Sequence, residues 1–302
     1  MANYPAIIHM RPEVRDFIRN RAWVHRGDVL TYGQNIRCDS FSTDSGGFRH
    51  STFAGRTMSF KDCLESEAYG LVLGPSNVYG FGIAGNENTL PSLLADRFGF
   101  PFANIGMPEG NSRNLFGLLF ALIARAPRLP RIVLHLSGGD FTSFCYTGLA
   151  DPVFGPPNIM QGMMAFKERG KKLPPAKTQL RPLLAFSSLW IMSIGQLCRS
   201  RNIPFVLGED TTFFEKAAPN EMDLKAELGR PLDAGQERQF KLHQRFVRDY
   251  HAKRRAAAEA LDVPICGPGF GNSVTFVDEF HFDVEGARLL CEHFAAGIEA
   301  AL

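Results

Sequence analysis

The sequence predicts an α/β protein in which helices cover both faces of a parallel β-sheet. Two observations support this fold class. From about residue 70 onward, short continuous apolar runs alternate with longer segments in which apolar residues recur at helical spacing. This alternation is the pattern of a parallel sheet whose strands are joined by crossover helices.

Five apolar runs are the predicted strands, and each is short and bounded by turn-forming residues. They comprise residues 69–73, 102–105, 131–136, 203–207 and 263–266. The predicted helices comprise residues 89–98, 111–126, about 180–199, about 236–261, and 283 to the C-terminus. In the first of these helices Leu90, Leu93, Leu94 and Phe98 share one face, and Asp283 has the chemistry of an N-cap for the last.

Two segments do not follow the alternation. Residues 1–66 precede the first strand and are predicted to form an N-terminal extension packed on the core, with a helix over residues 12–19. The main domain then spans residues 67–302. Within it, residues 141–178 are rich in proline and are predicted to form an irregular insertion, which is typical of a lid or a binding loop.

The composition limits the classes of partner. Of 302 residues, 45% are hydrophobic and 21% are charged, as in an ordinary globular protein. The net charge of +2 provides no overall field that would favour nucleic acid. No signal segment and no membrane span are visible, so we expect a cytoplasmic protein. The six cysteines show no metal-ligand spacing, and we expect neither a metal nor another cofactor.

The most informative residues are Asp278 and His281, just before the predicted last helix. A carboxylate three residues before a histidine can hold the far nitrogen of the imidazole and stabilise the imidazolium that forms when it takes a proton. Ser76, directly after the first predicted strand, is the candidate nucleophile. A serine after Gly-Pro is more often a helix cap, and the histidine alone could belong to the core edge, so structural roles stay open here.

Four segments of the chain resemble the sequence blocks of one enzyme family. They are residues 73–82, 104–112, 135–140 and 278–287, in this order. In these segments the chain resembles the SGNH (GDSL-type) hydrolases, a family of serine esterases, lipases and carbohydrate deacetylases. The resemblance covers roughly residues 44–300 and includes a Gly-Phe-Arg turn upstream of the first strand.

The resemblance implies a flavodoxin-like three-layer α/β/α sandwich with strand order 2-1-3-4-5. Such a sheet binds ligands beyond the carboxyl ends of its strands, where the strand order reverses. The implied triad has Ser76 attacking an acyl carbonyl, His281 accepting its proton and Asp278 orienting the imidazole. The implied function is a serine esterase or deacetylase, or an acyltransferase, that acts on small O-acyl groups of a carbohydrate or similar hydroxylated substrate.

The oxyanion-binding blocks depart from the family pattern. The family implies a backbone N–H from a glycine in the second block and a side-chain amide from an asparagine in the third. Here Glu109 stands at the glycine position between Gly106 and Gly110, and Gly139, followed by Asp140, stands at the asparagine position. These five are the candidate oxyanion or substrate-binding residues. A carboxylate aimed at an oxyanion would repel it, so Glu109 and Asp140 must turn away, be protonated or contact the substrate.

These departures support a second hypothesis, in which the chain is a catalytically degenerate module that binds a glycan or a protein partner without hydrolysis. Two features outside the site have structural interpretations. The basic run at residues 253–255 is interpreted as a solvated face, or alternatively as a contact for an anionic substrate. His135, inside an apolar strand, is interpreted as a buried, hydrogen-bonded histidine. The sequence does not indicate the oligomeric state.

Overall fold

The structure is a computed structural model of the whole chain. It describes residues 12–20, 24–26, 29–108, 110–136, 139–147, 150–156, 177–209, 211–216, 234–269, 273–277 and 280–302. Asp278 and Glu109, two of the predicted site residues, lie outside these ranges.

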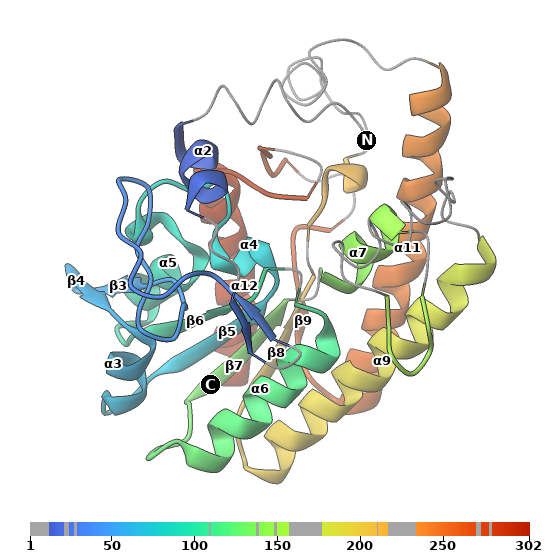
Figure 1. Cartoon of the computed structure of the whole chain (residues 1–302). Helices are drawn as coiled ribbons and strands as arrows, with labels where there is room; N and C mark the ends of the chain where they lie inside the picture. The colour runs from blue at the N-terminus through green and yellow to red at the C-terminus, as the bar shows by residue number, and fades with distance from the viewer. Residues whose placement is uncertain are drawn as a thin grey trace.

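The centre of the fold is a five-stranded parallel sheet (Figure 1). Its strands are β5 (Gly70–Gly74), β6 (Phe102–Gly106), β7 (Ile132–Leu136), β8 (Phe205–Gly208) and β9 (Ile265–Cys266). Their order across the sheet is β6-β5-β7-β8-β9, and all four neighbouring pairs are parallel. This is the predicted order 2-1-3-4-5, so the fold class is confirmed. The strand order reverses at β5, the strand that leads to Ser76.

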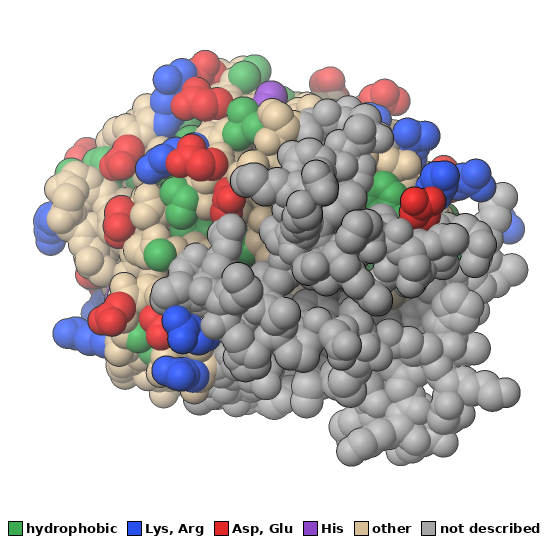
Figure 2. Space-filling model, turned by 90° about the horizontal axis from the view of Figure 1, so that it is seen from above, with side chains coloured by type: hydrophobic (Ala, Val, Ile, Leu, Met, Phe, Trp, Pro, Cys, Tyr) green, Lys and Arg blue, Asp and Glu red, His purple; other side chains and the backbone are tan. Residues whose placement is uncertain are grey.

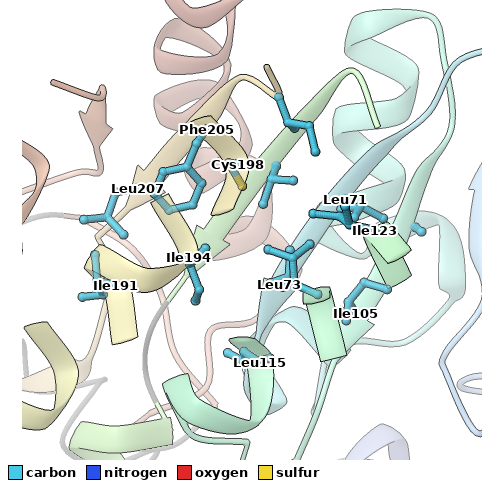
Figure 3. Close-up of a cluster of buried hydrophobic side chains, with 14 of the residues drawn as sticks. Leu71, Leu73, Ile105, Leu115, Ile123, Ile191, Ile194, Cys198, Phe205 and Leu207 are labelled. Atoms are coloured by element: carbon cyan, nitrogen blue, oxygen red, sulfur yellow. The ribbon is translucent and has the colours of Figure 1, made fainter. Parts of the chain in front are cut away.

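Helices cover both faces of the sheet. Helices α6 (Ser112–Arg125), α9 (Lys177–Ser200) and α11 (Ala234–Leu261) pack on one face, where the odd-numbered residues of β5 lie. Figure 3 shows this cluster, with Leu71 and Leu73 of β5 close to Ile105 and facing the apolar sides of α6 and α9. Helices α5 (Leu90–Phe98) and α12 (Val284–Ala301) cover the opposite face, where Val72 lies. The continuous apolar strands are therefore buried on both sides.

The N-terminal part of the chain packs on the core in two places. An aromatic cluster lies beside the segment that follows Ser76, whereas residues 51–53 contact α5 and β6, and residues 60–65 contact β6. The elements of this N-terminal part are α2 (Pro12–Arg19), β1 (Val24–Arg26), β2 (Val29–Thr31), β3 (Ser51–Phe53), β4 (Arg56–Met58) and α3 (Phe60–Glu65). Phe17, Tyr32 and Phe41 form a buried aromatic cluster with Tyr79, which lies three residues after Ser76. The extension thus supports the segment that follows the first strand of the sheet.

The segment after β7 differs from the prediction in part. Residues 141–178 were expected to be irregular, but α7 (Gly139–Thr147) occupies the first part of this stretch and α9 begins at Lys177. Phe141 and Phe144 of α7 enter a buried cluster with residues of α9 and α11, and this packing explains the extra helix. Residues 157–176 lie outside the described ranges.

The two structural interpretations outside the site have different outcomes. His135 is fully buried in β7, as predicted, and burial holds the pKa of its imidazole well below the ordinary value. The expectation that its ring is hydrogen-bonded is wrong, because neither ring nitrogen has a partner in the described part of the chain. The basic run 253–255 was predicted to be a solvated face, which is wrong for Arg254. Arg254 is only 1% exposed and donates a 2.7 Å hydrogen bond to the carbonyl oxygen of Gly208 at the end of β8.

Candidate active site

Ser76 lies where β5 ends and a short helix begins. β5 stops at Gly74, and α4 (Ser76–Tyr79) follows with Pro75 at its N-cap, where φ is −82°. A side chain on Gly74 would overlap Val78 of α4, so glycine lets the helix turn back close to the strand. The serine side chain is thereby held at the carboxyl end of β5, where the strand order reverses.

His281 reaches the same place from the other end of the chain. An isolated antiparallel bridge joins Phe276 to Phe282, and the N–H of Val277 donates to the carbonyl oxygen of His281 at 2.7 Å. Asp283 then caps α12 by accepting a hydrogen bond from the N–H of Gly286 at 2.9 Å. The histidine therefore lies on the second arm of a short hairpin that is fixed by backbone bonds and by a helix start.

The two side chains form a hydrogen bond. Ser76 Oγ lies 2.7 Å from His281 Nε2, although 205 positions separate the residues in the chain. The ring of Phe81 packs against the imidazole with a centroid distance of 4.5 Å. Both Ser76 and His281 are half-buried, so the pair is partly shielded and still reachable from solvent. A serine bonded to an imidazole nitrogen is the arrangement that general-base activation of a hydroxyl requires.

Gly106 packs directly under the helix that carries Ser76. It pairs with Gly74 across the β5–β6 ladder, and a side chain at Gly106 would overlap the backbone of Tyr79. Its N–H donates to the side-chain oxygen of Asn104 at 2.9 Å. The structure thus places Gly106 beside α4 as a close-packing position, with its N–H engaged inside β6.

Gly110 and Gly139 meet, so the second and third sequence blocks are in contact. A side chain on Gly139, at the start of α7, would overlap the carbonyl oxygen of Gly110. The N–H of Gly110 donates to the carbonyl oxygen of Met107 at 2.9 Å. Glycine at position 139 therefore allows the backbone at Gly110 to approach the start of α7 closely.

Asp140 holds the start of α6. Its carboxylate accepts hydrogen bonds from both the N–H and the hydroxyl of Ser112, the first residue of that helix, with a 2.8 Å distance from the N–H. Asp140 is 1% exposed, and burial raises the pKa of its carboxyl while the bonds from Ser112 oppose that rise. The sequence required that Asp140 turn away from the oxyanion, be protonated or contact the substrate. In the structure its carboxylate points toward the N-terminus of α6.

Arg49 supports the site and was not predicted as a functional residue. Its guanidinium is fully buried and donates to backbone carbonyl oxygens in the loop that follows α4, including Gly80 at 2.6 Å and Ile83 at 2.9 Å. The same loop carries Phe81, which packs on His281. The signal in the sequence was the Gly-Phe-Arg turn, which could be matched to a family pattern without indicating what the arginine binds.

The described residues show neither a metal site nor a membrane-crossing helix. No group of three or more His, Cys, Asp or Glu side chains among them could hold a metal ion. In the same part of the chain, no helix is both long enough and apolar enough to span a bilayer. Figure 2, a view from above, shows acidic and basic side chains interspersed on the described part of that face.

Comparisons with known proteins point to one group of solved structures. No protein-family model matches the chain, and no curated protein matches it. A GDSL-like lipase from Bacteroides thetaiotaomicron is 15% identical, with a TM-score of 0.47 over 78% of this chain and 90% of that one. AlinE4, an SGNH-hydrolase family esterase, is 16% identical, with a TM-score of 0.37 over 66% and 75%. A carbohydrate acetylesterase family member from Sinorhizobium meliloti is 16% identical, with a TM-score of 0.40 over 78% and 99%. The chain is similar in fold to SGNH hydrolases.

Proposed function

We propose that this protein is a serine hydrolase of carboxylic esters. The observation that carries the proposal is the 2.7 Å contact between Ser76 Oγ and His281 Nε2, at the point where the strand order of the sheet reverses. The role of the third residue falls to Asp278, which lies outside the described ranges and is proposed from its spacing to His281.

The chemistry follows from these positions. His281 Nε2 takes the proton of Ser76 as its oxygen adds to the ester carbonyl, and the resulting imidazolium is stabilised by Asp278. The tetrahedral adduct then collapses, the bond to the leaving alkoxide breaks, and His281 returns the proton to that alkoxide. Water repeats the same steps on the acyl-enzyme and releases the acid. With another hydroxyl in place of water, the same site would transfer the acyl group.

The oxyanion is assigned to the backbone N–H of Ser76, at the start of α4. The N–H groups of Gly106 and Gly110 already donate within the protein, and Gly139 brings no side-chain amide. A missing oxyanion donor lowers turnover by about 100- to 1,000-fold. We therefore expect a slow esterase. Neither Glu109 nor Asp140 is proposed to donate a hydrogen bond to the oxyanion.

The substrate class is proposed from the family resemblance: a small acyl group such as acetyl on a carbohydrate or a similar hydroxylated molecule. The second candidate function is a binding module for a glycan or a protein partner without hydrolysis. One observation favours it, namely that the N–H groups of Gly106 and Gly110 are engaged elsewhere. The two candidates differ in whether Ser76 reacts.

Labelling with a fluorophosphonate probe at neutral pH separates them. We expect stoichiometric modification of Ser76, located by mass spectrometry, and its loss in Ser76→Ala and His281→Ala. Ser42 is a matched control, because its hydroxyl also lies 2.8 Å from a histidine nitrogen, that of His50, but away from a strand-to-helix junction. Ser42→Ala should label normally. Folded protein that does not label would support the binding module.

A further inference from the structure

The face formed by α6, α9 and the turn after α7 carries most of the exposed apolar side chains. Among the residues that the structure describes, six large hydrophobic side chains are exposed. Four of them belong to this face: Phe120, Val153, Phe154 and Leu189. Val153 and Phe154 are the most exposed of the six, at 60% and 67%. A concentration of this kind marks an interaction surface rather than ordinary scatter.

A row of aromatic contacts joins α6 to α9 and begins at the exposed Phe120. Phe120 stacks on Phe116 with a centroid distance of 6.3 Å, and Phe116 contacts Trp190 of α9 at 5.3 Å. Trp190 contacts Phe186 one turn earlier at 6.3 Å. Helices α6 and α9 lie side by side along this row (Figure 1). The exposed ring of Phe120 is therefore part of a surface that bridges the two helices.

A defined turn presents the other end of this surface. Asp151 and Gly155 pair through two backbone hydrogen bonds of 2.9 and 3.1 Å, and the side chain of Asp151 accepts from the N–H groups of Val153 and Phe154. Gly155 packs on the ring of Phe186, so the turn is attached to α9. The turn thus exposes two adjacent large apolar side chains to water, and this exposure does not stabilise the folded protein.

The charges of the same helices have one sign. Helix α6 contains Arg113 and Arg125, helix α9 contains Lys177, Arg181 and Arg199, and neither helix contains Asp or Glu. Arg125, Arg181 and Arg199 are exposed. Asp151 is the acidic residue of the turn, and its carboxylate is engaged by the turn's own N–H groups. Cationic side chains beside exposed aromatic side chains suit an anionic lipid surface.

We propose that this face, here called the α6–α9 face, binds the surface of an anionic lipid bilayer. Phe120, Phe154 and Leu189 would enter the interface between headgroups and acyl chains, and the arginines would contact lipid phosphates. The overall charge of +2 gives no such attraction, so the binding depends on this local arrangement. The protein would lie on the membrane without spanning it. The proposal does not depend on the reactivity of Ser76.

Sedimentation with vesicles tests the proposal on the full chain. Vesicles of phosphatidylcholine with about one third phosphatidylglycerol should bind the protein, pure phosphatidylcholine vesicles should bind it more weakly, and high salt should weaken the anionic case. Phe120→Ser and Phe154→Ser should each lower the partition coefficient about tenfold, because each removes the burial of an aromatic ring. Arg125→Gln with Arg181→Gln should lower binding to the anionic vesicles about 25-fold.

Two matched controls lie away from this face. Leu302→Ser removes an apolar side chain of 52% exposure at the end of α12, and Arg56→Gln removes an exposed charge in the β3–β4 hairpin. Both should bind vesicles like the unchanged protein. Circular dichroism and urea unfolding of every variant check that the fold is intact.

Equal binding by the controls and by Phe120→Ser and Phe154→Ser would overturn the proposal, as would no binding to anionic vesicles. Size-exclusion chromatography with light scattering tests a different occupant of the face. If the protein is a dimer that Phe120→Ser converts to a monomer, and if it does not bind vesicles, the face binds a second copy of the chain instead. A protein that binds vesicles but does not label would retain this proposal and remove the hydrolase function.

Discussion

Replacement of Arg49 by methionine should destabilise the protein by about 3–5 kcal/mol, because the arginine is the donor for a buried ring of acceptors. The guanidinium donates to backbone carbonyl oxygens and to the side chain of Asn86. The carbonyl oxygens belong to Ser40, Tyr79, Gly80, Ile83 and Gly85. Methionine has a similar length and no donor. A buried acceptor that loses its donor costs about 1–3 kcal/mol, so two such losses already give the expected range.

Urea unfolding followed by circular dichroism measures this effect. Arg56→Met is the matched control, since Arg56 is exposed in the same N-terminal part, and it should change stability by less than about 0.5 kcal/mol. Because the loop held by Arg49 carries Phe81 against His281, Arg49→Met should also slow fluorophosphonate labelling of Ser76 under conditions where the variant is folded. A destabilisation below about 1 kcal/mol would refute the reasoning, because it would mean that water satisfies these acceptors at little cost.

Three further predictions concern stability. Asp140→Ala should cost about 2–4 kcal/mol in urea unfolding, because it leaves the N–H and hydroxyl of Ser112 without their acceptor, and Asp140→Asn should recover part of the loss. Gly106→Ala should lower the thermal midpoint of unfolding and the labelling of Ser76, because the added methyl group meets the backbone of α4. Gly117→Ala, in open space on α6, should leave the thermal midpoint unchanged or raise it. Equal changes of the thermal midpoint in the two variants would contradict this account. Burial lowers the pKa of His243 to about 4, so between pH 6.5 and 4 the unfolded state binds more protons than the folded state. The free energy of unfolding should therefore fall as the pH drops through that range, by up to about 3 kcal/mol from this residue. His243→Leu should flatten this part of the stability curve, and an unchanged slope would exclude His243 as its source.

The sequence alone was sufficient for the main elements of the fold. Strands and helices were predicted from the spacing of apolar residues, which is a local property of the chain. The strands β5 to β9 lie within a few residues of the predicted runs, and the order across the sheet agrees with that implied by the family resemblance. The main difference was α7, whose helical state depends on contacts with α9 and α11 that no local pattern contains.

The structure brings two of the predicted site residues together, and their catalytic roles stay predictions. Ser76 and His281 could be singled out because each follows a recognisable chain pattern, and the structure joins them by a hydrogen bond. Whether Gly106 and Gly110 offer free N–H groups could not be predicted, because their acceptors are set by the local path of the backbone. Asp278 and Glu109 lie outside the described residues, and their roles stay predictions.

The sequence by itself singled out Ser76 and His281 as candidate residues and indicated where the strands of the sheet end. Only the tertiary structure decided that Arg49 donates to the loop after α4, that Asp140 accepts hydrogen bonds from Ser112, and that Arg254 is buried. The physical reason is that apolar periodicity is set along the chain, whereas the partner of a buried polar group is set by packing between distant segments. A buried donor or acceptor must find a partner, and its choice among many candidates is made only once the layers of the fold have come together.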